Sequence, residues 1–232
     1  MSGLEMLGRL NEIPLFEGLS ERQLGWLRER FYARTYRAGV DVITAGSQGE
    51  IVYIILGGSV KVYMPQTDGT DVFLTLLGPG DPVGEMSLVD SEGRSASVVT
   101  LAETTLIWMN RADFRQALDS MPALANNLLR VFSRRLRHST HHIQTLSSLD
   151  VIGRVAYELL EFAGQYGQTL PGGEIHIPLR LTQGDLSDMV GASRKRVNQA
   201  IVELKHSGCI AVGADYTITI LDRKCLAGKA KR

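Results

Sequence analysis

Several features are scarce in this sequence, and each scarcity excludes a class of protein. The two cysteines, Cys209 and Cys225, suit a reducing compartment and are too few for an iron–sulfur cluster, which usually takes four thiolates. No run approaches the roughly 18 apolar residues of a membrane span, and the longest, Ile51 to Leu56, is typical of a buried strand. The opening MSGLEMLGRLNE contains acids and no basic segment before an apolar core, which predicts no secretory signal and a cytoplasmic location.

A net charge is also missing, because 25 basic residues balance 25 acidic ones. The distribution is uneven, however: from Arg180 to Arg232 ten Lys or Arg face five acids, a local excess of five positive charges. This asymmetry indicates a C-terminal module that binds a polyanion. At 232 residues, with 44% hydrophobic and 22% charged residues, the chain is expected to be soluble and long enough for two domains.

The region from Phe31 to Met109 has the pattern of a β domain. Short β-branched runs alternate with glycine turns, and Gly57-Gly58 and Asp68-Gly69 are hairpin signals. Many short strands at close spacing predict a β-sandwich or jelly roll. Because no histidine precedes His138, a jelly-roll metal enzyme such as an oxygenase or isomerase is disfavoured.

One segment of this region, GPGDPVGEMSLVDSEGRSASVV at 78–99, interrupts the strand pattern. Its glycines and prolines predict a loop, and Glu85 to Val89 can form one helical turn whose free N–H groups favour an anion. The planar fork of Arg94 and the hydroxyl of Ser95 suit a phosphate, while Glu85 can accept a hydrogen bond from a sugar hydroxyl. The alternative is an ordinary surface salt bridge between Glu85 and Arg94.

A long helix is predicted from about Pro122 to Leu149, between two halves of different composition. Its apolar residues recur at the heptad spacing of a coiled-coil seam, and a single chain would leave that stripe without a partner. We therefore interpret it as a dimer seam. The polar Ser139 and its neighbour Thr140 either contact a ligand where two subunits meet or only fix the register. The seam residues are Leu129, Phe132, Leu136, Ser139, Ile143 and Leu146.

The same helix carries a histidine cluster, His138, His141 and His142, whose spacing could hold a metal. Without a nearby cysteine or further carboxylate cluster in the sequence, a solvated helix face is the preferred interpretation, and no metal site is predicted. An exposed basic face is likewise expected for the arginines of this helix, which are Arg130, Arg134, Arg135 and Arg137.

The segment TQGDLSDMVGASRKRVNQAIVELKHSG at 182–208 has the pattern of a helix-turn-helix, with Gly191 at the turn. The following run CIAVGADYTITIL predicts a small hairpin, or wing. A plain helical hairpin is the alternative, but the second helix exposes donors suited to base edges, and capping hydroxyls suited to phosphates. The candidate DNA-binding residues are Thr182, Ser193, Arg194, Lys195, Arg196, Asn198 and Gln199.

The 78–99 segment resembles the phosphate-binding cassette of cyclic-nucleotide-binding domains. The full layout resembles the cyclic-AMP receptor protein and fumarate-nitrate regulator family of bacterial transcription factors. The resemblance implies an α+β chain with a cyclic-nucleotide-binding β jelly roll at 1–120, a dimerisation helix at 121–149 and a winged helix-turn-helix at 150–232. It also implies cyclic AMP as effector, no cofactor, and a nucleotide site formed by Gly84, Glu85, Met86, Arg94, Ser95, Ser139 and Thr140.

The resemblance further implies a homodimeric regulator and not an enzyme, with double-stranded DNA, a second copy and RNA polymerase as partners, and no membrane. Nucleotide binding would shift the dimer helix and set the recognition helices about 34 Å apart, one turn of DNA. Arg194 matches the family's recognition helix and predicts a guanine in each half-site, whereas Lys195 and Gln199 depart from the usual Glu and Arg. A ligand-independent regulator or one that responds to cyclic GMP is the alternative. An enzyme built on the roll is the rival from another class, but the sequence shows no nucleophile and base pair for it.

Overall fold

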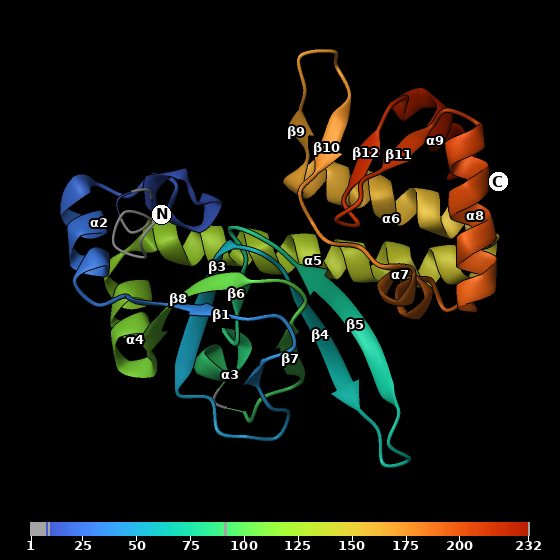
Figure 1. Cartoon of the computed structure of the whole chain (residues 1–232). Helices are drawn as coiled ribbons and strands as arrows, with labels where there is room; N and C mark the ends of the chain where they lie inside the picture. Colours follow the sequence, from blue (N-terminus) through green and yellow to red (C-terminus); the bar gives the residue numbers. More distant parts are fainter. Residues whose placement is uncertain (1–7, 9, 91, 232) are drawn as a thin grey trace. The chain divides into compact units, whose positions relative to one another are not determined.

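The computed structural model describes residues 8, 10–90 and 92–231, and it divides into two compact units, Met1–Leu136 and Arg137–Arg232 (Figure 1). Three parts of the sequence analysis fall outside the described residues. They are most of the N-terminal MSGLEMLGRLNE, one residue of the 78–99 segment, and the last basic residue, Arg232. The division falls inside the predicted dimerisation helix, so the three predicted domain boundaries remain predictions. Among the described residues, no helix is long and apolar enough to cross a membrane.

Two four-stranded antiparallel sheets form the first unit, in the orders β1-β8-β3-β6 and β2-β7-β4-β5. The short strands expected between Phe31 and Met109 are confirmed. The structure also contains two strands that the sequence did not predict, the edge strand β1 and the two-residue β6. The strands are β1 (Tyr32–Tyr36), β2 (Asp41–Ile43), β3 (Ile51–Gly57), β4 (Val60–Pro65), β5 (Asp71–Leu77), β6 (Pro82–Val83), β7 (Ser97–Thr100) and β8 (Thr104–Asn110).

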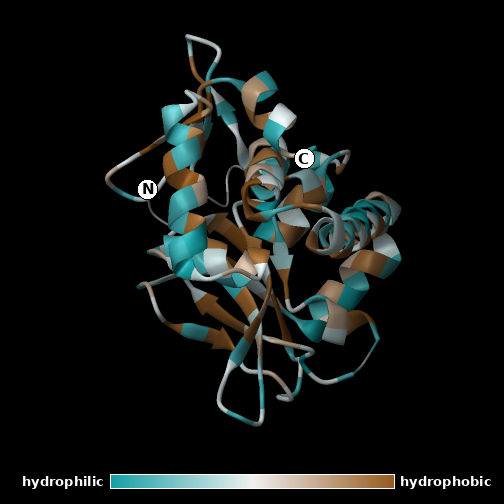
Figure 2. Cartoon of the chain, turned by 90° about the vertical axis from the view of Figure 1, so that its right-hand side faces the viewer, coloured by the Kyte–Doolittle hydropathy of each residue, from teal (hydrophilic) through white to brown (hydrophobic). Residues whose placement is uncertain are grey.

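Strand β3 shows why these residues form two layers. Its side chains alternate between faces, so Ile54 and Ile55, both fully buried, belong to different clusters. Ile55 packs between the two sheets, and Ile54 packs with helical residues such as Phe114. The turn after β3 needs a glycine, because Gly58 has φ +82° and a Cβ there would collide with the backbone carbonyl of Glu103. In Figure 2 the brown of hydrophobic residues gathers along such strands.

Helices cover the outer face of the β1-β8-β3-β6 sheet. They contribute buried Leu10, Leu24 and Phe114 to the cluster that packs on β3 and β8. The predicted central helix is confirmed as α5 (Pro122–Ser148), and α4 between the roll and α5 was not predicted. The other elements are the 3-10 turns η1 (Leu10–Glu12) and η2 (Pro14–Phe16), with α2 (Glu21–Arg28), α3 (Met86–Val89) and α4 (Arg111–Ser120).

The second unit is a winged helix-turn-helix, as the sequence predicts. Its four-stranded sheet has the order β11-β12-β10-β9, and Val197, Ile201 and Leu204 bury one face of α8. Gly191 between α7 and α8 adopts the left-handed conformation, φ +59°, that the tight turn requires. The elements are α6 (Val151–Tyr166), β9 (Gln168–Thr169), β10 (Ile175–Ile177), α7 (Gln183–Val190), α8 (Arg194–His206), β11 (Ile210–Val212), β12 (Ile218–Ile220) and α9 (Arg223–Lys229).

A disulfide joins Cys209, just before β11, to Cys225 in α9. The sequence associated these two cysteines with a reducing compartment, and the structure instead pairs them. The wing brings their Cα atoms to 5.4 Å, within the range that a disulfide spans. The bond therefore ties α9 to the chain that leaves α8.

Candidate nucleotide site and DNA interface

The structure gathers five of the predicted nucleotide-site residues in the loop between β6 and β7. Gly84 follows β6 with φ +79°, and a Cβ on it would collide with the guanidinium of Arg94, so the loop requires a glycine here. Glu85 precedes α3, the predicted helical turn, and makes no side-chain cap bond with it. Met86 and Ser95 are exposed beside each other, with Ser95 Oγ 4.0 Å from Met86 Sδ.

Arg94 is buried, with 8% of its surface exposed, and it bonds to acceptors in the loop and in β3. It donates to the carbonyl oxygens of Gly84 and Ile51 and, at 2.9 Å, to Ser87 Oγ. Burial lowers the pKa of Arg94, while the charges of Tyr53, Glu85 and Glu50 act in the opposite direction. A phosphate that binds Arg94 through these donors must therefore replace one of its present acceptors.

Glu85 is 2% exposed and accepts a hydrogen bond from Arg135 Nη1 of α5 at 2.6 Å. The same guanidinium donates through Nη2 to the carbonyl oxygen of Pro82, also at 2.6 Å. The ion pair of Glu85 is thus made with Arg135, in place of the surface salt bridge to Arg94 that the sequence left as an alternative. A buried carboxylate in such a pair is held in one geometry.

The expectation of an exposed arginine face on α5 is wrong for Arg135, whose side chain is 27% exposed. Arg134 is exposed as expected, and it pairs with the buried Asp81 at 3.2 Å. Arg130 donates to Asn127 on its own helix. Sequence reasoning missed Arg135 as a site residue. The available signal was its place one helical turn before Ser139, which puts both residues on one side of α5.

Ser139 and Thr140 lie on the part of α5 that belongs to the second unit, and both are exposed. Their predicted role as readers of a base stays a prediction. The neighbouring His138 and His142 contact Glu158 of α6, so the expected solvated histidine face is wrong for these two. No group of three or more His, Cys, Asp or Glu side chains in the part of the chain that the structure describes is arranged to hold a metal ion.

The apolar stripe of α5 is exposed in the single chain. Leu129, Leu136 and Ile143, seven residues apart, expose 61%, 70% and 69% of their surface, and Leu146 exposes 43%. Phe132 departs from the predicted stripe, because it packs partly against the core of the first unit. Large aliphatic side chains at this spacing and exposure are typical of a helix that packs on another helix.

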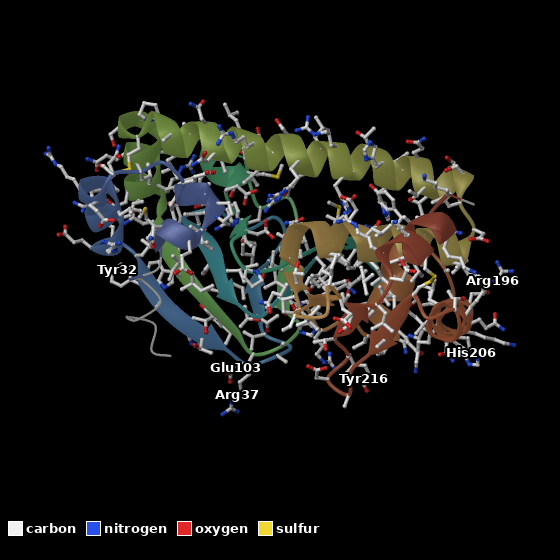
Figure 3. The ribbon with its side chains drawn as sticks, turned by 90° about the horizontal axis from the view of Figure 1, so that it is seen from above. Tyr32, Arg37, Glu103, Arg196, His206 and Tyr216 are labelled. Atoms are coloured by element: carbon white, nitrogen blue, oxygen red, sulfur yellow. A yellow bond between two sulfur atoms is a disulfide. The ribbon has the colours of Figure 1, made fainter. Side chains whose placement is uncertain are left out.

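The candidate DNA-binding side chains gather at the N-terminal end of α8. Arg194, Lys195 and Arg196 are exposed there, and Figure 3 shows Arg196 projecting away from the ribbon. Exposed Asn198 and Gln199 lie one turn further along the helix. A helix that presents arginine and amide side chains from its first turns has the geometry of a recognition helix.

The two predicted phosphate contacts, Thr182 and Ser193, are the N-caps of α7 and α8. Thr182 and Asp185 form a capping box, which fixes the start of α7. Sequence reasoning missed Gln183, whose Nε2 donates to Asn198 Oδ1 at 2.9 Å and so links α7 to the recognition helix. Its exposed place immediately after the Thr182 cap was the available signal.

Comparison with known proteins identifies a domain in each half of the chain. Residues 33–121 match the model of the cyclic nucleotide-binding domain, and residues 153–228 match that of the Crp-like helix-turn-helix domain. The chain is 34% identical to the CRP-like cAMP-activated global transcriptional regulator of Mycobacterium tuberculosis, over 94% of this chain and 96% of that protein. It is 31% identical to the cyclic AMP receptor protein of Thermus thermophilus, over 86% of this chain and 89% of that protein.

Among solved structures, FixK2 from Bradyrhizobium japonicum shares the fold with a TM-score of 0.73 and 22% identity, over 85% of this chain and 96% of that chain. The segment that matches the cyclic nucleotide-binding domain contains the β6–β7 loop, and the segment that matches the Crp-like helix-turn-helix domain contains α8. The chain therefore belongs to the cyclic-AMP receptor protein and fumarate-nitrate regulator family of transcription regulators.

Proposed function

We propose that this chain is a cyclic-AMP-responsive, homodimeric regulator that acts in the cytoplasm and binds a near-palindromic DNA site. The observation that carries the proposal is the presence in one chain of the buried Arg94 and Glu85 loop and the exposed basic end of α8. The two relatives named above, both called cyclic-AMP proteins, support cyclic AMP over cyclic GMP or ligand independence.

In the proposed site, Arg94 and Ser95 bind the cyclic phosphate, and Glu85 accepts a hydrogen bond from the ribose. Gly84 leaves room for the Arg94 guanidinium, and Met86 lies beside Ser95 at the exposed edge of the loop. Because Glu85 is paired with Arg135, a ribose hydroxyl that bonds to Glu85 competes with a residue of α5. Nucleotide binding in this loop would therefore act directly on α5, and Ser139 and Thr140 would read the adenine further along the helix.

The proposed partner of the α5 stripe is a second copy of the chain. Leu129, Leu136 and Ile143 repeat at the coiled-coil period, and a parallel dimer aligns each of them with its own copy. Two recognition helices related by a two-fold axis would read half-sites about one DNA turn apart, and Arg194 would contact a guanine in each. RNA polymerase is the proposed further partner.

A calorimetric titration with cyclic AMP tests the nucleotide site. Binding around micromolar, or about −8 kcal/mol, is expected for the wild type. Arg94→Ala should abolish it, because the phosphate loses its guanidinium. Arg37→Ala removes an exposed arginine of the same unit, labelled in Figure 3, and should bind as the wild type does. The absence of heat with wild-type protein would overturn cyclic-AMP dependence and leave the DNA-binding assignment in place.

A further inference from the structure

The second unit contains a buried carboxylate that neither proposed site uses. Glu158 of α6 is 1% exposed, and its two oxygens face two histidines of α5. Oε2 lies 3.3 Å from His138 Nε2, and Oε1 lies 2.7 Å from His142 Nδ1. The two imidazole rings are nearly parallel, with centroids 6.1 Å apart. His141, one residue away on the same helix, is exposed.

The cluster joins two helices with different proposed roles. The α5 segment between His138 and His142 contains Ser139 and Thr140, the proposed base readers. Glu158 belongs to α6, which packs against the recognition helix α8 in the same unit. A carboxylate out of contact with water is costly unless it is paired, so burial of Glu158 favours the arrangement in which both histidines are held against α6.

The charged groups that act on the cluster come from α5 and α6. The hydrogen bond from Glu158 raises the pKa of His138 against the effect of burial, and the charges of Glu158 and Glu161 add to the rise. Burial alone would raise the pKa of Glu158, but the hydrogen bonds and charges of the two histidines outweigh it and lower that pKa. Burial, with Glu161 and Glu158, raises the pKa of Tyr157 to about 12, so Tyr157 stays neutral.

We propose that His138, His142 and Glu158 are positioning residues that hold the Ser139 and Thr140 segment of α5 against α6, and thereby couple effector binding to DNA binding. This inference rests on the proposed function. It extends that function from the two binding sites to the segment that connects them, and it assigns a role to side chains that contact neither ligand.

The direction in which pH changes the stability of this contact follows from the pKa shifts of His138 and Glu158. The pKa of His138 is raised in the folded protein. Its contribution to the stability of the contact with Glu158 is therefore complete below the pKa of about 6.5 that an unfolded histidine has, and it is lost as the pH rises through the higher pKa of the folded state. The pKa of Glu158 is lowered in the folded protein. Its contribution to the stability of the contact is therefore complete above the pKa near 4.5 that it has in the unfolded chain, and it is lost only at lower pH. The contact of Glu158 with His138 and His142, which we call the clamp, is therefore tightest between about pH 4.5 and 6.5. It loosens as the pH rises through the raised pKa of His138.

Hydrogen exchange of the full-length protein at pH 6 and pH 8, corrected for the intrinsic exchange rate, tests the clamp without any ligand. Amide protection in residues 137–148 should fall with rising pH, up to about tenfold for each unit by which the folded and unfolded pKa of His138 differ. Glu158→Gln keeps the size of the side chain and should remove this dependence. The matched control His141→Gln alters an exposed histidine of the same helix and should retain it. Equal pH dependence in all three proteins would overturn the clamp.

An NMR titration of the wild-type imidazoles gives a readout that needs no variant. The His138 imidazole should titrate above the ordinary histidine value of about 6.5, and a midpoint at or below that value would contradict the proposed pairing.

The coupling between effector binding and DNA binding is measured as a ratio of two cyclic-AMP dissociation constants. One is measured without DNA, and the other with a duplex that the wild type selects from a randomised library. Glu158→Gln should lower this ratio severalfold and make it independent of pH, while His141→Gln matches the wild type. An unchanged ratio in Glu158→Gln would overturn the positioning role and leave the proposed function standing. If wild-type protein binds no cyclic AMP, the proposed function fails and the coupling fails with it.

Discussion

The loop that we assign to the nucleotide and the helix end that we assign to DNA use the same residue type in opposite ways. Arg94 is buried and donates to three protein acceptors, whereas Arg194 is exposed at the start of α8. Three hydrogen bonds tie the buried arginine to the fold, so a ligand that takes these donors exchanges bonds with the protein. The exposed one contributes little to the fold and can meet DNA without such an exchange. We therefore expect ligand binding to change the structure at the first site, where a ligand would compete for bonds that hold the fold.

The largest expected effect is on the free energy of unfolding, and it distinguishes Arg94 from Arg194. Arg94→Ala removes the donor that bonds to the carbonyls of Gly84 and Ile51 and to the Ser87 hydroxyl, and should destabilise the first unit by about 3 to 5 kcal/mol. Arg194→Ala should change stability by less than about 0.5 kcal/mol, as exposed substitutions usually do. Urea unfolding of both variants and the wild type measures the difference. Equal losses in the two variants would contradict the contrast drawn here.

The next effect concerns the covalent tie in the DNA-binding unit. The disulfide joins residues separated by 16 positions, and closing a loop of that size stabilises by about 3 kcal/mol in the chain-entropy treatment. Reduction should therefore lower the unfolding temperature of the second unit and leave that of the first unchanged. Cys225→Ser should unfold like the reduced wild type under both conditions. If reductant has no effect on the wild type, Cys209 and Cys225 are thiols in solution.

Local pattern was enough to predict much of the architecture. Heptad spacing predicted α5, and the Thr182 and Ser193 caps and Gly191 marked both helices of the DNA-binding unit. The residues that sequence reasoning missed or misplaced depend on contacts between distant segments. Glu85 and Arg135 are 50 positions apart, and His142 and Glu158 are 16 apart. The arginines and histidines of α5 have the spacing of a polar helix face, and only the folded chain shows which carboxylates they meet.

The smallest of these effects is the most specific, and it concerns base preference. Arg194→Ala should cost about 1 to 3 kcal/mol of discrimination at one base position in each half-site, if its fork contacts guanine. Arg130→Ala is the control, because Arg130 bonds to Asn127 on its own helix in the other unit, and it should leave the preference unchanged. Competition binding to a duplex series that varies each position singly measures both variants. A uniform loss of affinity for Arg194→Ala on every duplex would mean that Arg194 contacts only phosphate, and would assign the reading of sequence to neighbours such as Asn198 and Gln199.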